Sequence, residues 1–325
     1  MKALQIQRTG GPEVMELVDL PIPEPGEGEL RVKMEAAGLN YSDIAIRRGS
    51  YLTKIPMPLV MGREFAGTVD KLGPGVEGWQ TGQRATGVLW DGGAFAEYVV
   101  VPARSASPFP EGLSAAEAVI LPIQGTTAVH LVDEVTRVQS GETVLIHAAA
   151  GGVGLLAVQI CRLRGANVIG TASSDEKCET LRGYGATAIN YSQGDWVAEV
   201  LKATGGKGAD VILESIGGEV FLRSLREALA PFGRLAVYGA ASGEMAEFAQ
   251  RELMPGSKTV VGYFLGDYYP HRVDRVRAAV QNLLLWAAQG KVKLVVGHTF
   301  PLAQAAEAVA VMEERRNIGK VVITG

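Results

Sequence analysis

The chain has 325 residues, and its 47% hydrophobic and 20% charged residues are typical of globular proteins. This length exceeds what one small core accommodates, so we expect two domains. The formal net charge of −4 provides no basic surface, which excludes nucleic acid as an expected partner. Two cysteines, Cys161 and Cys178, cannot form a disulfide framework, and the start does not resemble a signal peptide, so we expect a cytoplasmic protein. No apolar run has the length of a membrane span, so no membrane insertion is expected.

Residues 1–122 are predicted to be rich in strands. Turn residues cluster at 10–12 (GGP), 21–26 (PIPEPG), 73–75 (GPG) and 91–93 (DGG). Short segments typical of strands, such as 30–34, lie between these turns. The pattern predicts a partly barrel-like, antiparallel β domain.

Residues from about 123 onward alternate between strand and helix patterns. The predicted strands are residues 143–147, 167–171, 188–190, 210–214, 234–238 and 259–263. Their helix-length separations predict a parallel, doubly wound sheet, and so an α/β fold. Two helices follow, and residues 320–324 form a last strand that returns to the first domain. We therefore predict a first domain of 1–122 and 265–325, and a second domain of 123–264.

A glycine-rich turn directly follows the first strand of the second domain. The apolar strand 144–147 leads into 148–154 (AAAGGVG), and a helical pattern continues from there. A dinucleotide pyrophosphate needs backbone N–H groups at a helix N-terminus, and large side chains would hold it away. The turn differs from GxGxxG because Ala149 replaces the first glycine, but its strand–turn–helix context supports cofactor binding. The expected binding residues are Ala150, Gly151, Gly152, Val153 and Gly154.

The second strand of this domain indicates which dinucleotide binds. Dinucleotide sites that prefer NAD usually place an acid there to accept hydrogen bonds from the ribose hydroxyls. Here Ser173 and Ser174 end the strand and Lys177 follows one turn later, a set that favours a 2′-phosphate and thus NADPH. Asp175 or Glu176 could be the missing acid, although both fit the first turn of a helix. Lys177 could also be only a solvated surface charge.

Several motifs together resemble the medium-chain dehydrogenase/reductase superfamily, and within it the zinc-independent quinone oxidoreductases. The resemblance covers nearly the whole chain and lies at 36–43 (AAGLNYSD), 62–64 (GRE), 73–76 (GPGV), 82–84 (GQR), 148–154 (AAAGGVG), 185–186 (GA), 190–191 (NY) and 319–322 (GKVV). It implies a GroES-like catalytic domain, a Rossmann domain and NADPH. It also implies a homodimer or homotetramer.

The chain departs from the zinc-containing branch of the same superfamily. Those relatives have Cys where this chain has Asn40, and His where it has Arg63. The four histidines lack the spacing of metal ligands, so we expect no zinc, and we expect His147 to be positional. Arg63 could form a salt bridge with Glu64 or another acid.

The absence of zinc would restrict the reaction. Oxidising an alcohol needs help with a proton of high pKa, whereas a quinone or an α,β-unsaturated carbonyl already accepts a hydride readily. The resemblance implies that Tyr51 lies near NADPH or donates a proton, and that Asn40 orients a substrate oxygen beside the nicotinamide. Tyr51 could instead be a loop residue packed on Leu52 and Pro56.

Further cofactor contacts follow from position. The resemblance places Gln124 and Thr127 near the nicotinamide and Tyr191 near the adenosine, and strand ends at the carboxyl edge add Gly239, Ala240, Ala241, Phe264 and Leu265. Each could equally be ordinary packing. Three functions remain open: an NADPH-dependent quinone reductase, an NADPH-dependent enoyl or alkenal double-bond reductase, and a non-enzymatic dinucleotide-binding protein.

Overall fold

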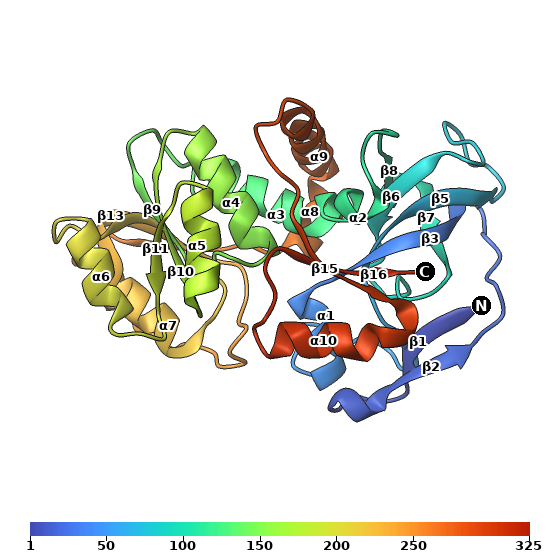
Figure 1. The fold of residues 1–325 in the computed structure, drawn as a ribbon, viewed down its shortest axis with the longest axis horizontal. Coiled ribbons are helices and arrows are strands. Elements are labelled where there is room, and N and C mark those ends of the chain that lie inside the picture. The colour runs from blue at the N-terminus through green and yellow to red at the C-terminus, as the bar shows by residue number, and fades with distance from the viewer. The chain divides into compact units, whose positions relative to one another are not determined.

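The computed structural model describes residues 1–325. The chain divides into two compact units, residues 1–123 with 294–325, and residues 124–293. The first unit is mostly β, and the second alternates strands and helices around a parallel sheet (Figure 1). The predicted α/β fold is therefore confirmed.

The first unit contains a seven-stranded sheet and a three-stranded sheet. The larger sheet has the order β15-β16-β3-β5-β6-β8, and β7 also pairs with β3. The smaller sheet has the order β2-β1-β4. The bounds are β1 Lys2–Ile6, β2 Met15–Asp19, β3 Glu29–Leu39, β4 Leu59–Val60, β5 Glu64–Leu72, β6 Arg84–Val88, β7 Tyr98–Pro102, β8 Ala106–Pro108, β15 Val296–Pro301 and β16 Lys320–Thr324.

Strand β3 organises the core of the first unit. Its buried side chains alternate at Leu30, Val32 and Met34, as expected for a strand with one covered face. Residues 36–39 are all buried, because both faces of this stretch are covered: Ala37 and Leu39 belong to the main core, and Ala36 packs in a second cluster with Ala115 and Ala118. The helices of this unit are α1 Tyr41–Arg48, α2 Ala115–Ala118 and α10 Ala305–Glu313.

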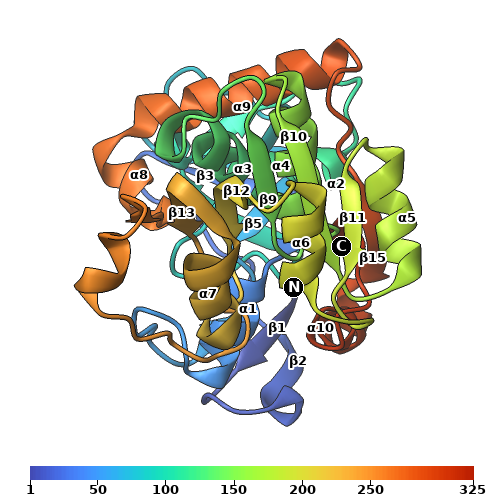
Figure 2. The same ribbon diagram turned by 90° about the vertical axis from the view of Figure 1, so that its left-hand side faces the viewer.

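The second unit is a parallel, doubly wound sheet with the order β11-β10-β9-β12-β13-β14. This is the strand order of a Rossmann fold, and the direction of winding reverses between β9 and β12. Helices α4 and α5 cover one face of the sheet, and α6 and α7 cover the other (Figure 2). The bounds are β9 Thr143–Ile146, α4 Gly152–Leu163, β10 Asn167–Ala172, α5 Asp175–Gly183, β11 Thr187–Asn190, α6 Trp196–Ala203, β12 Ala209–Glu214, α7 Gly218–Arg223, β13 Leu229–Val237 and β14 Thr259–Gly262.

Residues 265–293 lie in the second unit, whereas the sequence prediction placed them with the first. They include α8 Leu265–His271 and α9 Val273–Ala288. Trp286 of α9 lies under the guanidinium of Arg164, with 5.1 Å between Cζ and the ring centroid. The side chain of Gln159 accepts from Lys293 N at 2.7 Å and donates to Lys293 O at 3.1 Å. These contacts attach residues that come after β14, the last strand of the sheet, to α4 and its C-terminal end. The second unit therefore continues beyond the point where the regular alternation of strand and helix ends.

One helical run is longer and more apolar than the sequence analysis expected. Residues Ala115–Val135 form 21 residues of continuous helix that includes α3 Thr126–His130, and by length and composition it could cross a membrane. However, 83% of its apolar window is buried inside the protein, as in the core helix of a globular protein. The fold therefore already accounts for its apolar character.

Candidate active site

Asn40 is the N-cap residue that precedes α1, and its side chain is held inside the first unit. The Asn40 Oδ1 accepts a hydrogen bond from Lys320 Nζ at 3.0 Å. The Asn40 Nδ2 donates to Glu64 Oε2 at 3.0 Å and to Gly38 O at 3.3 Å. Both amide hydrogens are thus used within the protein. This geometry leaves Asn40 no donor for a substrate oxygen, in contrast to the role expected from the sequence.

The partner of Asn40 is a buried ion pair. Lys320 Nζ lies 2.5 Å from Glu64 Oε2, and both side chains have 0% exposure. The other carboxylate oxygen of Glu64 accepts from Ile123 N at 2.7 Å. A buried pair of charges is tolerated only when its remaining groups are hydrogen-bonded in this way. Sequence analysis missed the role of Lys320, although a lysine that opens the otherwise apolar strand β16 is a visible signal.

Arg63 is a buried cation without an ionic partner. It is 3% exposed, and its Nε and Nη1 atoms are buried without a hydrogen-bond partner. Its Cζ lies 4.9 Å from the ring centroid of Tyr51 and 4.8 Å from that of Trp90. The suggested salt bridge with Glu64 is wrong, because Lys320 occupies that carboxylate.

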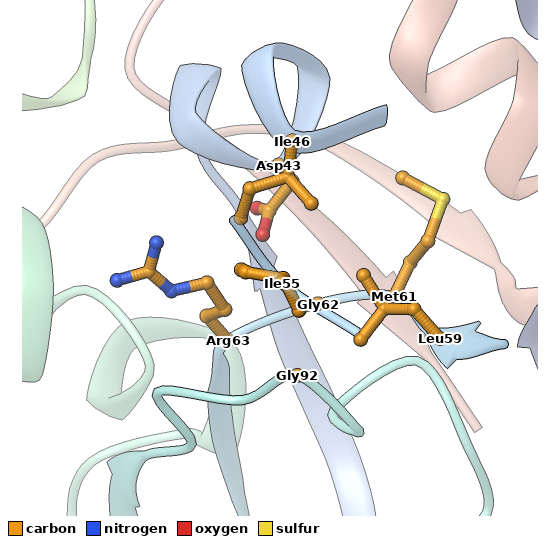
Figure 3. A pocket seen from close by; sticks show the side chains of 8 residues that line it. All are labelled: Asp43, Ile46, Ile55, Leu59, Met61, Gly62, Arg63 and Gly92. Atoms are coloured by element: carbon orange, nitrogen blue, oxygen red, sulfur yellow. The ribbon is translucent and has the colours of Figure 1, made fainter. Parts of the chain in front are cut away.

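Asp43 and Arg63 both line a small pocket in the first unit. The Asp43 Oδ2 accepts from Asn40 N at 2.8 Å, which caps α1, while its Oδ1 is buried without a hydrogen-bond partner. Burial raises the pKa of the Asp43 carboxyl to about 6. The rest of the lining is apolar or glycine (Figure 3), and consists of Ile46, Ile55, Leu59, Met61, Gly62 and Gly92 beside Asp43 and Arg63.

Tyr51 lies in the loop that follows α1. Gly49 ends the helix in the left-handed conformation at φ 76°, which turns the chain toward Tyr51. The Tyr51 ring is half-buried, packs against the core of the unit and contacts the Arg63 guanidinium. Its neighbour Leu52 is 73% exposed. The structure therefore places Tyr51 beside the pocket lined by Asp43 and Arg63.

In the second unit, the glycine-rich turn connects β9 to α4. Gly151 precedes the helix with φ −76° and ψ 176°, a conformation that any residue can adopt. A Cβ on Gly151 would approach only Ala148 O, at 3.3 Å. A Cβ on Gly154 would lie 2.6 Å from Ala149 Cα, so that glycine lets the helix pack on the turn. The protein itself requires glycine at Gly154 far more than at Gly151.

Gln124 lies against the start of α4. A Cβ on Gly152 would overlap the Gln124 side chain, whose Oε1 is buried without a hydrogen-bond partner. Ala150 is 2% exposed, and Val153 is in the first turn of α4. Thr127 is 7% exposed on α3. The N–H groups at the N-terminus of α4 have the character expected of a dinucleotide cradle.

The end of β10 contains the residues predicted for the 2′-phosphate. Ser174 begins α5, and its Oγ accepts from Lys177 N at 3.3 Å. Lys177 is 9% exposed, so it is not the solvated surface charge considered above. Asp175 accepts from Asn190 Nδ2 at 2.8 Å and from Gln193 Nε2 at 3.1 Å. Both carboxylate oxygens of Asp175 therefore have partners within the protein.

The other predicted cofactor residues lie where strands of this sheet end. Ser173 follows β10, Tyr191 follows β11, Gly239, Ala240 and Ala241 follow β13 by one residue, and Phe264 precedes Leu265 shortly after β14. Parallel strands end at one edge, so the fold gathers these positions with the glycine-rich turn along the carboxyl edge of the sheet.

His147 follows β9 and is 3% exposed. Its Nδ1 hydrogen-bonds to Thr171 Oγ1 at 3.1 Å, and its Nε2 to Ser224 Oγ at 2.9 Å. Burial lowers the pKa of the imidazole to about 4, so His147 is neutral at physiological pH. No group of three or more His, Cys, Asp or Glu side chains is placed to hold a metal ion.

Comparison with known proteins identifies the family. Residues 26–111 match the family described as alcohol dehydrogenase GroES-like domain, and residues 152–284 match that described as zinc-binding dehydrogenase. A quinone oxidoreductase of Pseudomonas aeruginosa is 35% identical over 327 aligned positions, covering 99% of both chains. The chain belongs to the quinone oxidoreductase family of the medium-chain dehydrogenases/reductases.

Two other relatives extend the comparison. A 2-haloacrylate reductase of a Burkholderia species is 35% identical and covers 99% of this chain and 98% of its own. The structure of Escherichia coli quinone oxidoreductase complexed with NADPH matches with a TM-score of 0.94 and 30% identity, covering 100% of both chains. The similarity to the quinone oxidoreductase family thus includes both units of the chain.

Proposed function

We propose that this protein is an NADPH-dependent reductase of quinones that works without zinc. The observation that carries the proposal is a quinone oxidoreductase fold in which Asn40 and Arg63 stand where zinc ligands are expected. A site without a Lewis-acidic metal needs an acceptor that is already electrophilic, and quinones meet that need. The comparisons support an oxidoreductase of this family, and the quinone is the substrate that we infer.

The second unit fits NADPH. Its helix α4 begins at a turn where Gly151 leaves room for a pyrophosphate oxygen to approach the backbone. Lys177 and the serines at the end of β10 supply hydrogen-bond donors and a positive charge for a 2′-phosphate. Related proteins of this fold have been determined with NADPH bound. We infer that the cofactor contacts are Gln124, Thr127, Ala150, Gly151, Gly152, Val153, Gly154, Ser173, Ser174, Lys177, Tyr191, Gly239, Ala240, Ala241, Phe264 and Leu265.

The first unit supplies the groups that meet the acceptor. When bound, NADPH supplies a hydride. Tyr51, whose ring contacts Arg63, contributes an O–H donor that can stabilise the charge developing on a conjugated oxygen. The apolar lining near Arg63, including Ile55 and Met61, excludes water and strengthens that interaction. Asn40 positions Glu64 and Lys320 and is not assigned to substrate binding.

A second candidate is a double-bond reductase that acts on α,β-unsaturated carbonyl compounds. The specific observation that favours it is the 35% identical 2-haloacrylate reductase, whose named substrate is an unsaturated acid. The two reactions share hydride addition to a conjugated system and differ in the acceptor.

A panel of acceptors tests the proposal. Purified protein is assayed for oxidation of NADPH and of NADH with 1,4-naphthoquinone, alkenals, unsaturated acids and enoyl thioesters. We expect faster turnover with NADPH than with NADH, and with quinone above the other acceptors. Metal analysis of the same preparation is expected to find zinc well below one atom per chain. No turnover with any acceptor would leave a non-enzymatic dinucleotide-binding protein as the better interpretation.

The predicted homodimer or homotetramer and the cytoplasmic location remain predictions. The sheet of the second unit has an open edge at β14, whose only strand partner is β13. Phe232 and Met254 are 76% and 77% exposed, and Phe232 hydrogen-bonds to the loop that precedes β14. An open edge with exposed apolar side chains is a surface through which a second copy can pair. Light scattering after gel filtration measures the assembly.

A further inference from the structure

Arg63 differs from the other buried cations of the first unit. Arg47 and Lys320 are both fully buried, and each is paired with a carboxylate, Glu313 and Glu64 respectively. Arg63 is 3% exposed and forms no ion pair within 4.0 Å. A guanidinium cannot lose its charge in a protein, so burial without an anion is costly unless a ligand supplies one.

The aromatic contacts of Arg63 do not replace an anion. The rings of Tyr51 and Trp90 lie 4.9 and 4.8 Å from its Cζ and stabilise the charge by cation–π interaction. They hold the guanidinium in place, but its Nε and Nη1 still have no hydrogen-bond acceptor. A carboxylate binds two N–H groups on one edge of this planar group, as Asp133 binds Nε and Nη2 of Arg164, so it would use Nε or Nη1 of Arg63 together with Nη2.

The neighbouring acids are unable to act as direct partners. Glu64 accepts hydrogen bonds on both oxygens, from Lys320 and Asn40 on one and from Ile123 N on the other. Asp43 uses Oδ2 to cap α1, and Figure 3 shows its carboxyl and the Arg63 guanidinium at the same pocket. Asp43 nevertheless lies beyond ion-pair distance of Arg63. Burial raises the pKa of Asp43 and the Arg63 charge opposes that rise, so Asp43 acts as a counter-ion at longer range and the protein provides none at ion-pair distance.

We propose that Arg63 is a substrate-binding residue that pairs with the carboxylate of an α,β-unsaturated acid. The inference rests on the second candidate activity, the double-bond reductase, and names acceptors that carry a carboxylate as a substrate class of that activity. A carboxylate would give the guanidinium an anion at ion-pair distance and bind two N–H groups on one of its edges, which a neutral acceptor does not.

Arg63 also favours the reaction of this class. Hydride addition at the β-carbon breaks a C–H bond of the bound dinucleotide, and the π electrons of the C=C bond move onto the carboxylate. A proton from water then adds at the α-carbon, so the acid gains one hydride and one proton, while the dinucleotide loses that hydride and with it two electrons. The carboxylate carries an additional negative charge during this step, which a fixed guanidinium stabilises.

Crotonate and methyl crotonate make a matched pair of test acceptors, because they share a carbon skeleton and differ in charge. We expect Arg63→Met to lower kcat/KM for crotonate about 10- to 100-fold. For methyl crotonate and for 1,4-naphthoquinone the same variant should change kcat/KM by less than about 3-fold, and the KM for NADPH should stay unchanged. Lys54→Gln removes an exposed charge from the same loop region and serves as the control that affects neither acceptor.

Two further measurements keep the test decisive if Arg63→Met folds poorly. Arg63→Lys retains the charge without the planar donors, and it should lose part of the crotonate selectivity. Trp90 fluorescence in the absence of NADPH should respond to crotonate and not to its ester, and Trp90→Phe should remove the response.

The possible outcomes separate the two proposals. Equal losses for crotonate and its ester, or a rise in the KM for NADPH alone, would overturn the carboxylate assignment. If only the KM for NADPH rises, Arg63 binds a cofactor phosphate. If the losses for crotonate and its ester are equal, Asp43 is the counter-ion of Arg63 at longer range. If wild-type protein turns over quinone but neither crotonate nor its ester, the proposed function stands and the inference about Arg63 is wrong. If no acceptor is reduced, the proposed function itself fails.

Discussion

Replacing Gly151 by Ala separates a cofactor requirement from a folding requirement. Gly151 has an ordinary extended conformation, and its new methyl group would approach only Ala148 O, at 3.3 Å. Ala lowers the conformational entropy of the unfolded chain relative to Gly, which stabilises the folded protein by about 0.4–1 kcal/mol and offsets the close approach. We expect the thermal unfolding temperature of the ligand-free protein to change by no more than about 2 °C.

The effect on the dinucleotide should be much larger. The methyl group stands where a pyrophosphate oxygen would approach the N-terminus of α4, and losing one charge-assisted hydrogen bond costs about 1.5–3 kcal/mol. We therefore expect the Kd for NADPH to rise by about 10- to 150-fold. Isothermal titration calorimetry measures the Kd, and differential scanning calorimetry without ligand measures stability.

Gly154→Ala is the matched control. Its methyl group would lie 2.6 Å from the backbone of Ala149, so the helix must shift and stability should fall by about 1–3 kcal/mol. The two variants should therefore behave differently. Gly151→Ala weakens NADPH binding and keeps the stability of the protein, whereas Gly154→Ala reduces its stability. Unchanged NADPH affinity in Gly151→Ala would refute the assignment of this turn to the pyrophosphate.

Three further predictions concern charged and titratable groups. Lys177→Ala should reduce the preference for NADPH over NADH by about 10-fold or more in kcat/KM, and an unchanged preference would remove Lys177 from the 2′-phosphate site. Lys320→Met leaves the Glu64 charge buried and unpaired, so the free energy of unfolding measured in urea should fall by about 3–5 kcal/mol. Adding Glu64→Gln should restore part of this loss, and additive losses would contradict the pairing. Burial lowers the pKa of His147 from 6.5 to about 4, so the unfolded chain binds a proton in that interval and the folded chain does not. Stability from this residue should therefore fall by about 3 kcal/mol as pH decreases through the interval. His147→Gln should remove this pH dependence. The raised pKa of Asp43 acts in the opposite direction, with stability falling as pH rises from 3.8 toward about 6, so wild type and variant are compared at each pH.

The glycine-rich turn illustrates what a local pattern can predict. An apolar strand, a turn of small residues and an apolar helix follow one another within 20 residues at 144–163, so short-range propensity determines the motif. The parallel sheet was predictable for the same reason, since each of its strands is separated from the next by a helix-length segment. The assignment of α9 was not, because nothing in its amphipathic pattern says which unit covers its apolar face.

The pocket of the first unit shows the opposite case. The sequence indicated that Asn40 and Arg63 replace zinc ligands, but it suggested a substrate role for Asn40 and an ion pair between Arg63 and Glu64. Lys320 lies 256 residues from Glu64 in the sequence and pairs with its carboxylate. Lys320 also fixes the Asn40 amide, and Arg63 is left without this carboxylate as a partner. A contact over such a distance has no signature in local spacing.

The sequence by itself therefore determined the fold class and predicted the nucleotide-binding turn and the replacement of the zinc ligands, because each depends on neighbouring residues or on residue identity. Only the tertiary structure decided which buried charges are paired. Pairing depends on distances of a few ångströms between strands β5 and β16, and the chain must fold before those distances exist.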